Sequence, residues 1–219
     1  MPGPFSRHRS RADESGSTRY AGASSDYLFH ECKEESISRV AVILADGFEE
    51  VEATAIIDVL RRAEIDTVVA GLHEGHITSA RKVKIIPDTT IDTVRVDDFD
   101  MIVLPGGQPG TDNLNADPRV KELIKGFSRK GKLIGAICAA PMVLASAGVL
   151  QGKHATSYPS CKASLGDAIY EEKSVVTDGN VLTSRGAGTA LTFGLAIVER
   201  LVSKEKAQKI KESMMIHYD

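Results

Sequence analysis

The chain has 219 residues, which suits one domain of ordinary size with an extension. Its 42% apolar and 26% charged residues are typical of a globular protein in water, and its formal net charge of −3 lacks the basic excess that phosphate backbones select. No stretch approaches the roughly 18 consecutive apolar residues of a membrane span, and the N-terminus has no apolar secretory signal. These totals predict neither a nucleic-acid nor a membrane partner.

Three cysteines, Cys32, Cys138 and Cys161, are too few and too unevenly spaced to predict a disulfide framework. No two of them form the C-x-x-C pair that is typical of zinc sites. We therefore expect free thiols, no metal and a reducing compartment, which indicates the cytoplasm.

Residues 1–38 differ from the rest of the chain. They are rich in Ser, Gly and charge and show no sustained apolar period, a composition typical of disorder. The arginines among serines also resemble an organelle transit peptide, although Asp13 and Glu14 depart from the acid-poor pattern of such peptides. We therefore expect a disordered or targeting extension over 1–38, with organellar import left open, and a single domain over 39–219.

From Arg39 onward, short apolar runs alternate with helical periods, which predicts an α/β domain with a mostly parallel sheet and helices on both faces. The expected strands are 40–44, 67–70, 83–86, 101–104, 133–137, a short one near Thr156, and a hairpin pair around 178–180. The expected helices are 50–63, 118–130, one from Ala139, 189–201 and 204–215.

Glu52 lies where the first strand leads into the first helix, within the sequence ADGFEEVE of residues 45–52. At 3.6 residues per turn, Glu52 shares a face with Ile56 and Leu60, whereas Glu50 lies on the polar face. A carboxyl on an apolar face needs a partner or a raised pKa, so we predict that Glu52 points inward for a functional reason. The alternative is that Glu52, like Glu50, only suits the positive end of the helix dipole.

The segment Leu104–Gly107 (LPGG) ends another buried strand. Its paired glycines, Gly106 and Gly107, would let backbone N–H groups approach a ligand and form an oxyanion hole, although a glycine turn after a strand is common. The loop Ser184–Thr189 can likewise be interpreted either as part of a ligand site or as an ordinary glycine turn between a strand and a helix. Neither loop has the G-x-G-x-x-G spacing of dinucleotide sites, and no Walker lysine follows a glycine cluster, so no nucleotide cofactor is predicted.

Cys138 directly follows the strand 133–137, and Pro141 then begins a helix. Such a turn lifts the side chain above the carboxyl edge of the sheet and places the sulfur beside unpaired helix N–H groups. We therefore predict a lowered thiol pKa and a nucleophilic thiolate, with a buried structural cysteine as the alternative. A protonated Glu52 nearby would favour the thiolate and an ionised one would repel it, so the two groups should titrate as a coupled pair.

Four segments, in this order and at these separations, resemble the DJ-1/ThiJ/PfpI superfamily on its DJ-1/YajL-like branch. They are ADGFEEVEA (45–53), LPGG (104–107), GAICAAP (135–141) and LTSRGAGT (182–189). The resemblance runs from about Arg39 to Asp219. It implies a flavodoxin-like fold and a homodimer with the active site close to the interface.

The resemblance also implies roles for particular residues. Cys138 matches the family's redox-sensitive nucleophile, and Glu52 matches the buried acid that contacts it. The backbone that lines the pocket is matched by Gly106, Gly107 and Ala139.

Tyr158 and Ala139 are among the positions that depart from parts of the superfamily. Tyr158 stands where the DJ-1 branch has a histidine near the nucleophile, and the YajL branch also has an aromatic residue there. His154 is a reserve candidate, because on an extended strand it would share a face with Tyr158, although a lone histidine is more often structural. Ala139 replaces the histidine that follows the nucleophile in the protease branch, which argues against peptidase activity.

The resemblance implies an enzyme that acts on reactive dicarbonyls, such as methylglyoxal or its adducts on proteins, as a glutathione-independent glyoxalase or deglycase without a cofactor. Cys138 would add to the aldehyde, backbone N–H groups at Gly107 and Ala139 would hold the oxyanion, and Glu52 would move protons. The alternative is a redox-sensing stress protein or chaperone in which Cys138 is oxidised without significant turnover. A third hypothesis, an inactive site, leaves the inward Glu52 unexplained.

Overall fold

The computed structural model of the chain describes residues 37–216. Contacts along the chain divide it into two units, Met1–Glu35 and Ser36–Asp219, and only the second contains described residues. The disordered or targeting extension expected at 1–38 therefore lies almost wholly outside the described residues, as does Cys32.

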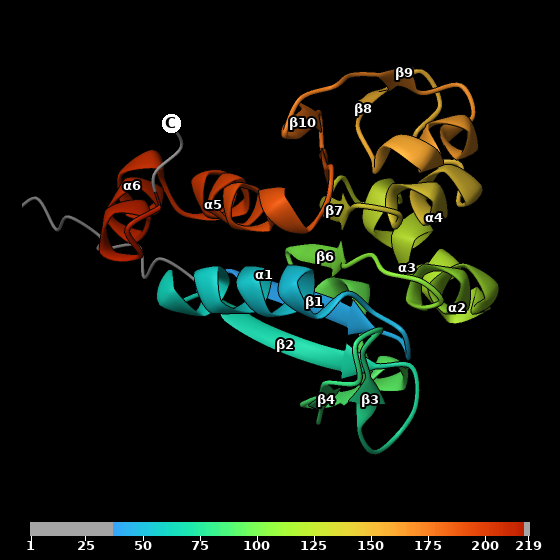
Figure 1. Ribbon diagram of the computed structural model, residues 1–219, viewed down its shortest axis with the longest axis horizontal. Helices are drawn as coiled ribbons and strands as arrows, with labels where there is room; N and C mark the ends of the chain where they lie inside the picture. Colours follow the sequence, from blue (N-terminus) through green and yellow to red (C-terminus); the bar gives the residue numbers. More distant parts are fainter. Residues whose placement is uncertain (1–36, 217–219) are drawn as a thin grey trace, which may run out of the picture. The chain divides into compact units, whose positions relative to one another are not determined.

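The second unit is built around a seven-stranded sheet in the order β10-β11-β7-β6-β1-β2-β5. All neighbouring strands are parallel except β10 and β11, which form an antiparallel hairpin. The sheet consists of β1 (Arg39–Leu44), β2 (Asp66–Gly71), β5 (Thr89–Thr90), β6 (Met101–Leu104), β7 (Leu133–Ile137), β10 (Val175–Asp178) and β11 (Val181–Ser184) (Figure 1). The predicted α/β fold with a mostly parallel sheet is confirmed.

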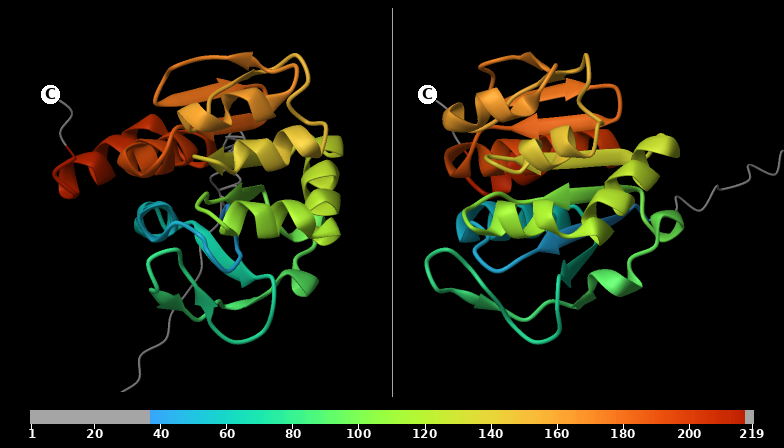
Figure 2. Two further views of the ribbon diagram at one scale, coloured as in Figure 1. Left: turned by 45° about the vertical axis from the view of Figure 1, so that its right-hand side comes forward. Right: turned by 90° about the vertical axis from the view of Figure 1, so that its right-hand side faces the viewer.

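Helices cover both faces of this sheet, as the left view of Figure 2 shows. One face carries α1 (Glu50–Arg62), α5 (Ala190–Leu201) and α6 (Lys204–Ser213). The other carries α2 (Gly110–Ala116), α3 (Pro118–Arg129) and α4 (Pro141–Ser146). Because successive strand residues point to opposite faces, Val42 of β1 packs in the first core and its neighbour Ile43 in the second. Both faces of β1 are thus buried, which explains its unbroken apolar sequence.

Smaller elements complete the unit. Two two-stranded sheets pair β3 (Ile77–Thr78) with β4 (Lys84–Ile85) and β8 (His154–Ala155) with β9 (Ile169–Tyr170). Short 3₁₀ helices span Ile91–Thr93, Val96–Asp98, Pro159–Leu165 and Ala187–Thr189. No helix among residues 37–216 is long and apolar enough to cross a membrane.

The structure differs from the sequence-based expectations at its short elements, and the two-residue strands β3, β5 and β9 were not expected. The strand expected at 83–86 is only the two-residue β4, which pairs with β3 and not with the main sheet. The helix α2 was not expected, because its seven residues (GTDNLNA) contain one large apolar side chain, Leu114, and so show no helical period.

The topology places the four candidate segments together. The strands β11, β7, β6 and β1 are consecutive in the sheet and parallel, so their carboxyl ends meet at one edge. Each of these strands is followed by one of the loops that the sequence had indicated as a pocket element. This is the edge at which open α/β sheets bind ligands.

Candidate active site

Cys138 occupies the turn between β7 and α4, as predicted. Its φ angle is +64°, in the left-handed region that non-glycine residues seldom adopt. Backbone hydrogen bonds hold it there: its N–H donates to the Ser184 carbonyl at 3.0 Å, and its own carbonyl accepts from the Tyr158 N–H at 2.8 Å. The side chain is half-buried and the thiol is free. This strained, braced geometry is that of a nucleophile elbow.

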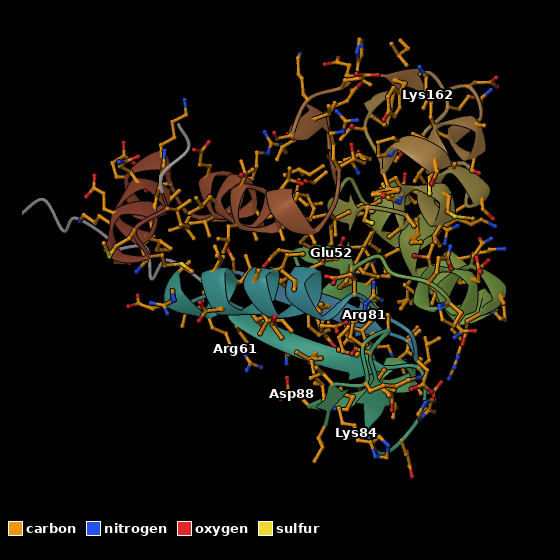
Figure 3. The ribbon with its side chains drawn as sticks, in the orientation of Figure 1. Glu52, Arg61, Arg81, Lys84, Asp88 and Lys162 are labelled. Atoms are coloured by element: carbon orange, nitrogen blue, oxygen red, sulfur yellow. The ribbon has the colours of Figure 1, made fainter. Side chains whose placement is uncertain are left out.

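Glu52 lies in the first turn of α1 and is fully buried, as its helical position predicted. Its Oε2 accepts a hydrogen bond from the Gly106 N–H at 2.8 Å. Its Oε1 is buried and has no hydrogen-bond partner of good geometry among the described residues. Figure 3 shows Glu52 at the end of α1 that lies next to the end of β6. The carboxyl therefore stands at the strand edge from which Cys138 emerges.

Gly106 lies between the two groups and shows how close they are. A Cβ atom added at Gly106 would be 2.7 Å from the Cβ of Cys138 and 2.9 Å from Oε2 of Glu52. No real Cβ tolerates such contacts, so this position needs glycine. The next residue, Gly107, has a φ of +95°, and a Cβ there would be 2.4 Å from the Glu49 nitrogen. The paired glycines thus allow the loop to pack against both the acid and the cysteine.

The two functional groups shift each other's protonation. Burial raises the pKa of Glu52 from its usual 4.5 to about 7, against the lowering effects of hydrogen bonds with Cys138 and Gly106. Burial also raises the pKa of the Cys138 thiol to about 12, with further contributions from the Glu52 charge and the hydrogen bond to Glu52. The backbone N–H groups of Ala139 and Gly107 act in the opposite direction.

These shifts correct one expectation and support another. The N–H groups beside Cys138 lower its pKa as predicted, but the prediction of a thiol with an overall lowered pKa is wrong beside an ionised Glu52. Burial and charge repulsion outweigh the backbone dipoles there. The predicted coupling is present: the pair loses one proton near neutral pH and holds the second to high pH.

Of the two other side chains predicted for the site, Tyr158 lies next to Cys138 in the structure, whereas His154 bonds elsewhere. The segment of Tyr158 adjoins Cys138 through the backbone bond described above. The ring of His154 instead pairs with Glu171, with Nδ1 2.5 Å from Oε1, and the backbone N–H of His154 donates to the Asp178 carboxyl. None of these bonds connects His154 to the cysteine, so its reserve role gains no support.

Sequence reasoning missed the contacts that hold the pocket loops together. The Glu49 N–H donates to the Gly106 carbonyl at 2.8 Å, and the Gly110 N–H donates to the Gly47 carbonyl at 3.1 Å. These bonds join the loop after β1 to the loop after β6. The glycines were the available signal, since a Cβ at Gly47 or Gly110 would clash with the facing backbone.

No group of three or more His, Cys, Asp or Glu side chains that could hold a metal ion occurs between residues 37 and 216.

The fold and the site define a class of cysteine-centred α/β proteins. Its features here are a cysteine at a strand-to-helix elbow, a buried carboxyl beside the cysteine, and a glycine loop that packs against both. Comparison with known proteins places the chain within this class. It belongs to the DJ-1/PfpI family, whose model matches residues 38–200.

Relatives and solved structures agree with this assignment. Protein dj-1beta of Drosophila melanogaster is 46% identical over 181 residues, which are 81% of this chain and 97% of the relative. Its crystal structure has a TM-score of 0.80 and covers 83% of this chain and 100% of that one. The glutathione-independent glyoxalase DJR-1.2 of Caenorhabditis elegans is 34% identical over 82% of this chain and 96% of its own length. A structure described as Toxoplasma gondii DJ-1, oxidized, is 35% identical, with a TM-score of 0.79 and coverage of 83% and 100%.

Proposed function

We propose that this chain is a cofactor-independent cysteine enzyme that converts reactive dicarbonyls to hydroxy acids. The observation that carries the proposal is the buried Glu52 carboxyl beside the Cys138 thiol, where burial raises the pKa of Glu52 to about 7. A buried acid with a pKa near the working pH can both release and accept a proton during a reaction. The relative named as a glutathione-independent glyoxalase supports the substrate class.

The reactive form of the pair is a Cys138 thiolate beside a protonated Glu52. Above about pH 7 the pair carries one negative charge. In the reactive form this charge is on the Cys138 sulfur, and in the competing form it is on the Glu52 carboxylate beside a neutral thiol. The thiolate is the nucleophilic form of cysteine. Because a neutral Glu52 no longer repels the thiolate, the Ala139 and Gly107 N–H groups then stabilise the sulfur anion without opposition from a second charge.

The reaction balances without an external oxidant. The thiolate forms a bond to the aldehyde carbon of methylglyoxal, and the resulting alkoxide lies within reach of the backbone N–H groups. Glu52 then moves the proton on the former aldehyde carbon to the neighbouring ketone carbon through an enediol, so the first carbon is oxidised and the second reduced. Water cleaves the thioester that results, which releases lactate and restores the thiol. In an adduct of methylglyoxal on a protein amine, the thiolate would bond to the carbinol carbon as the bond from that carbon to the amine nitrogen breaks, and the amine would leave with the proton of Glu52.

The alternative function is a redox sensor or oxidation-dependent chaperone. The observation that favours it is the half-buried free thiol beside backbone donors that would also stabilise a sulfinate. One relative is known in a structure described as oxidized. This function uses the same sulfur but needs no turnover.

Two measurements on the same purified chain distinguish the functions. We expect methylglyoxal to yield lactate over many turnovers, while intact mass after mild peroxide shows only partial oxidation in the time of the assay. A rapid gain of two oxygens on Cys138 with no lactate above background would contradict the enzyme and favour the sensor. The assay omits glutathione, so that a spontaneous thiol adduct cannot supply the substrate.

A homodimer in the cytoplasm remains part of the proposal. Exposed apolar side chains near α1 and the β3–β4 hairpin suit a contact between two copies; they are Val51, Val83 and Ile86, with exposures of 52%, 46% and 82%. Sedimentation equilibrium is expected to give twice the chain mass, and a monomer at micromolar concentration would show this part to be wrong.

A further inference from the structure

Tyr158 is an exposed aromatic residue at the edge of the candidate site. It is 50% exposed, although its N–H donates to the Cys138 carbonyl at 2.8 Å. Because half of the Tyr158 side chain is open to solvent, packing within the domain uses only part of its surface. The site chemistry described above also makes no use of it.

The backbone beneath Tyr158 is held firmly. The Thr156 N–H donates to the Thr183 hydroxyl at 2.9 Å, and the Ser157 carbonyl accepts from the Tyr170 hydroxyl at 3.2 Å. Thr156 and Ser157 are fully buried. The exposed ring therefore stands on a fixed support, which reduces the conformational entropy that a contact with a ligand would cost.

The ring also reaches the loop on the other side of the nucleophile. Its Cδ2 atom lies 3.6 Å from the position of a Cβ added at Gly186, which is ordinary van der Waals distance. Gly186 follows Ser184 by two residues, and the Ser184 carbonyl accepts the Cys138 N–H. The ring thus joins the two segments that hold the Cys138 backbone, and it presents an apolar surface at that point.

We infer that the Tyr158 ring is a wall of the substrate pocket that favours 2-oxoaldehydes with an aromatic substituent over those with a methyl group. This inference rests on the proposed function and names the substrate class more narrowly. Aromatic rings attract one another in offset or edge-to-face contacts, whereas a methyl group offers little area for such a contact. The contact lies away from the reacting carbons, so it should strengthen substrate binding more than it speeds the chemical step.

The test compares phenylglyoxal with methylglyoxal in the wild type, Tyr158→Ala and Tyr158→Phe. For the alanine variant, we expect kcat/KM for phenylglyoxal to fall about threefold to tenfold more than for methylglyoxal, mainly through KM. The phenylalanine variant keeps the ring and should keep the wild-type ratio within about twofold. Equal losses for both substrates in the alanine variant would overturn the inference, because that is the result of a purely structural role.

A binding measurement separates this inference from the proposed function. Mandelate and lactate are the hydroxy acids that correspond to the two substrates, and the concentration at which each protects Cys138 from alkylation measures binding without turnover. We expect mandelate to protect the wild type at lower concentration than lactate, and Tyr158→Ala to lose this difference. If turnover is absent but the difference is found, the proposed function fails and the aromatic wall stands. Equal protection by both acids would overturn the inference about the Tyr158 ring, even if the enzyme is active.

Discussion

Replacement of Cys138 by serine is expected to lower the turnover of methylglyoxal by more than about 1000-fold, because a hydroxyl in this setting forms no appreciable anion near neutral pH. Glu52→Gln is expected to lower it by about 100-fold or more, the usual contribution of a positioned acid-base group. The glutamine keeps the size of the side chain and can still face the sulfur. Lactate release under saturating methylglyoxal measures both effects.

Matched variants separate chemistry from folding. Cys161→Ser removes the other described free thiol, and Glu50→Gln removes a carboxyl from the polar side of the same helix turn. Both should stay within about twofold of the wild type, since neither residue is among the groups that shift the pKa values of the pair. Full glyoxalase activity in Cys138→Ser, with an unchanged circular dichroism spectrum, would rule out the mechanism.

The second large effect concerns stability. The folded chain should lose stability as pH rises from about 5 to about 8, because burial raises the pKa of Glu52 from 4.5 to about 7. Between these values the folded state binds a proton that the unfolded state has released, so folding is favoured at the acidic end. One pKa unit corresponds to about 1.4 kcal/mol, which makes the Glu52 contribution roughly 3 kcal/mol across this range. Urea unfolding at several pH values measures it.

Glu52→Gln is the comparison that isolates this contribution. The variant cannot ionise, so its unfolding free energy should fall much less over the same pH range. His73 acts in the same direction: hydrogen bonds to the Glu74 carbonyl and Asp46 raise its pKa, so its stabilisation is lost as pH rises. That contribution is present in both proteins and cancels in the difference. If the unfolding free energies of the two proteins change in parallel over this pH range, Glu52 is already ionised in the folded state and its pKa is not raised.

The elements that sequence could predict are those with a strong period. The strands β1, β6 and β7 are buried on both faces and read as unbroken apolar runs, and α1 shows the inward Glu52 because the other inward positions are apolar. Short elements leave a weaker signal. The strand β4 falls within the segment expected at 83–86, but its partner β3 was not expected, because their hairpin is held by backbone hydrogen bonds and by its contact with the loop after β1.

The sequence predicted which residues lie together in the candidate site, but it did not predict their pKa values. Because parallel strands end at one edge, Cys138 and Glu52 could be placed together from their positions after β7 and β1. Their pKa values depend on burial and on the distance between the groups, which no spacing in the sequence reveals. The sequence does reveal where a helix begins, and therefore which N–H groups lie beside Cys138. The lowering of the thiol pKa by these groups was overestimated, because the opposing effects of burial and of the Glu52 charge could not be read from the sequence.

The sulfur of Cys138 and the carboxyl of Glu52 share one proton, and the rate of Cys138 alkylation by iodoacetamide as a function of pH measures this sharing. We expect the rate to rise with a midpoint near pH 7, where the pair loses its first proton, well below the ordinary thiol pKa of 9.0. In Glu52→Gln the thiol titrates alone in a buried position, and an amide is a weaker donor than a carboxylic acid, so the midpoint should rise by at least about one unit. A wild-type rate that begins to rise only above pH 9, or a midpoint that is the same in both proteins, would show that the two groups do not share a proton.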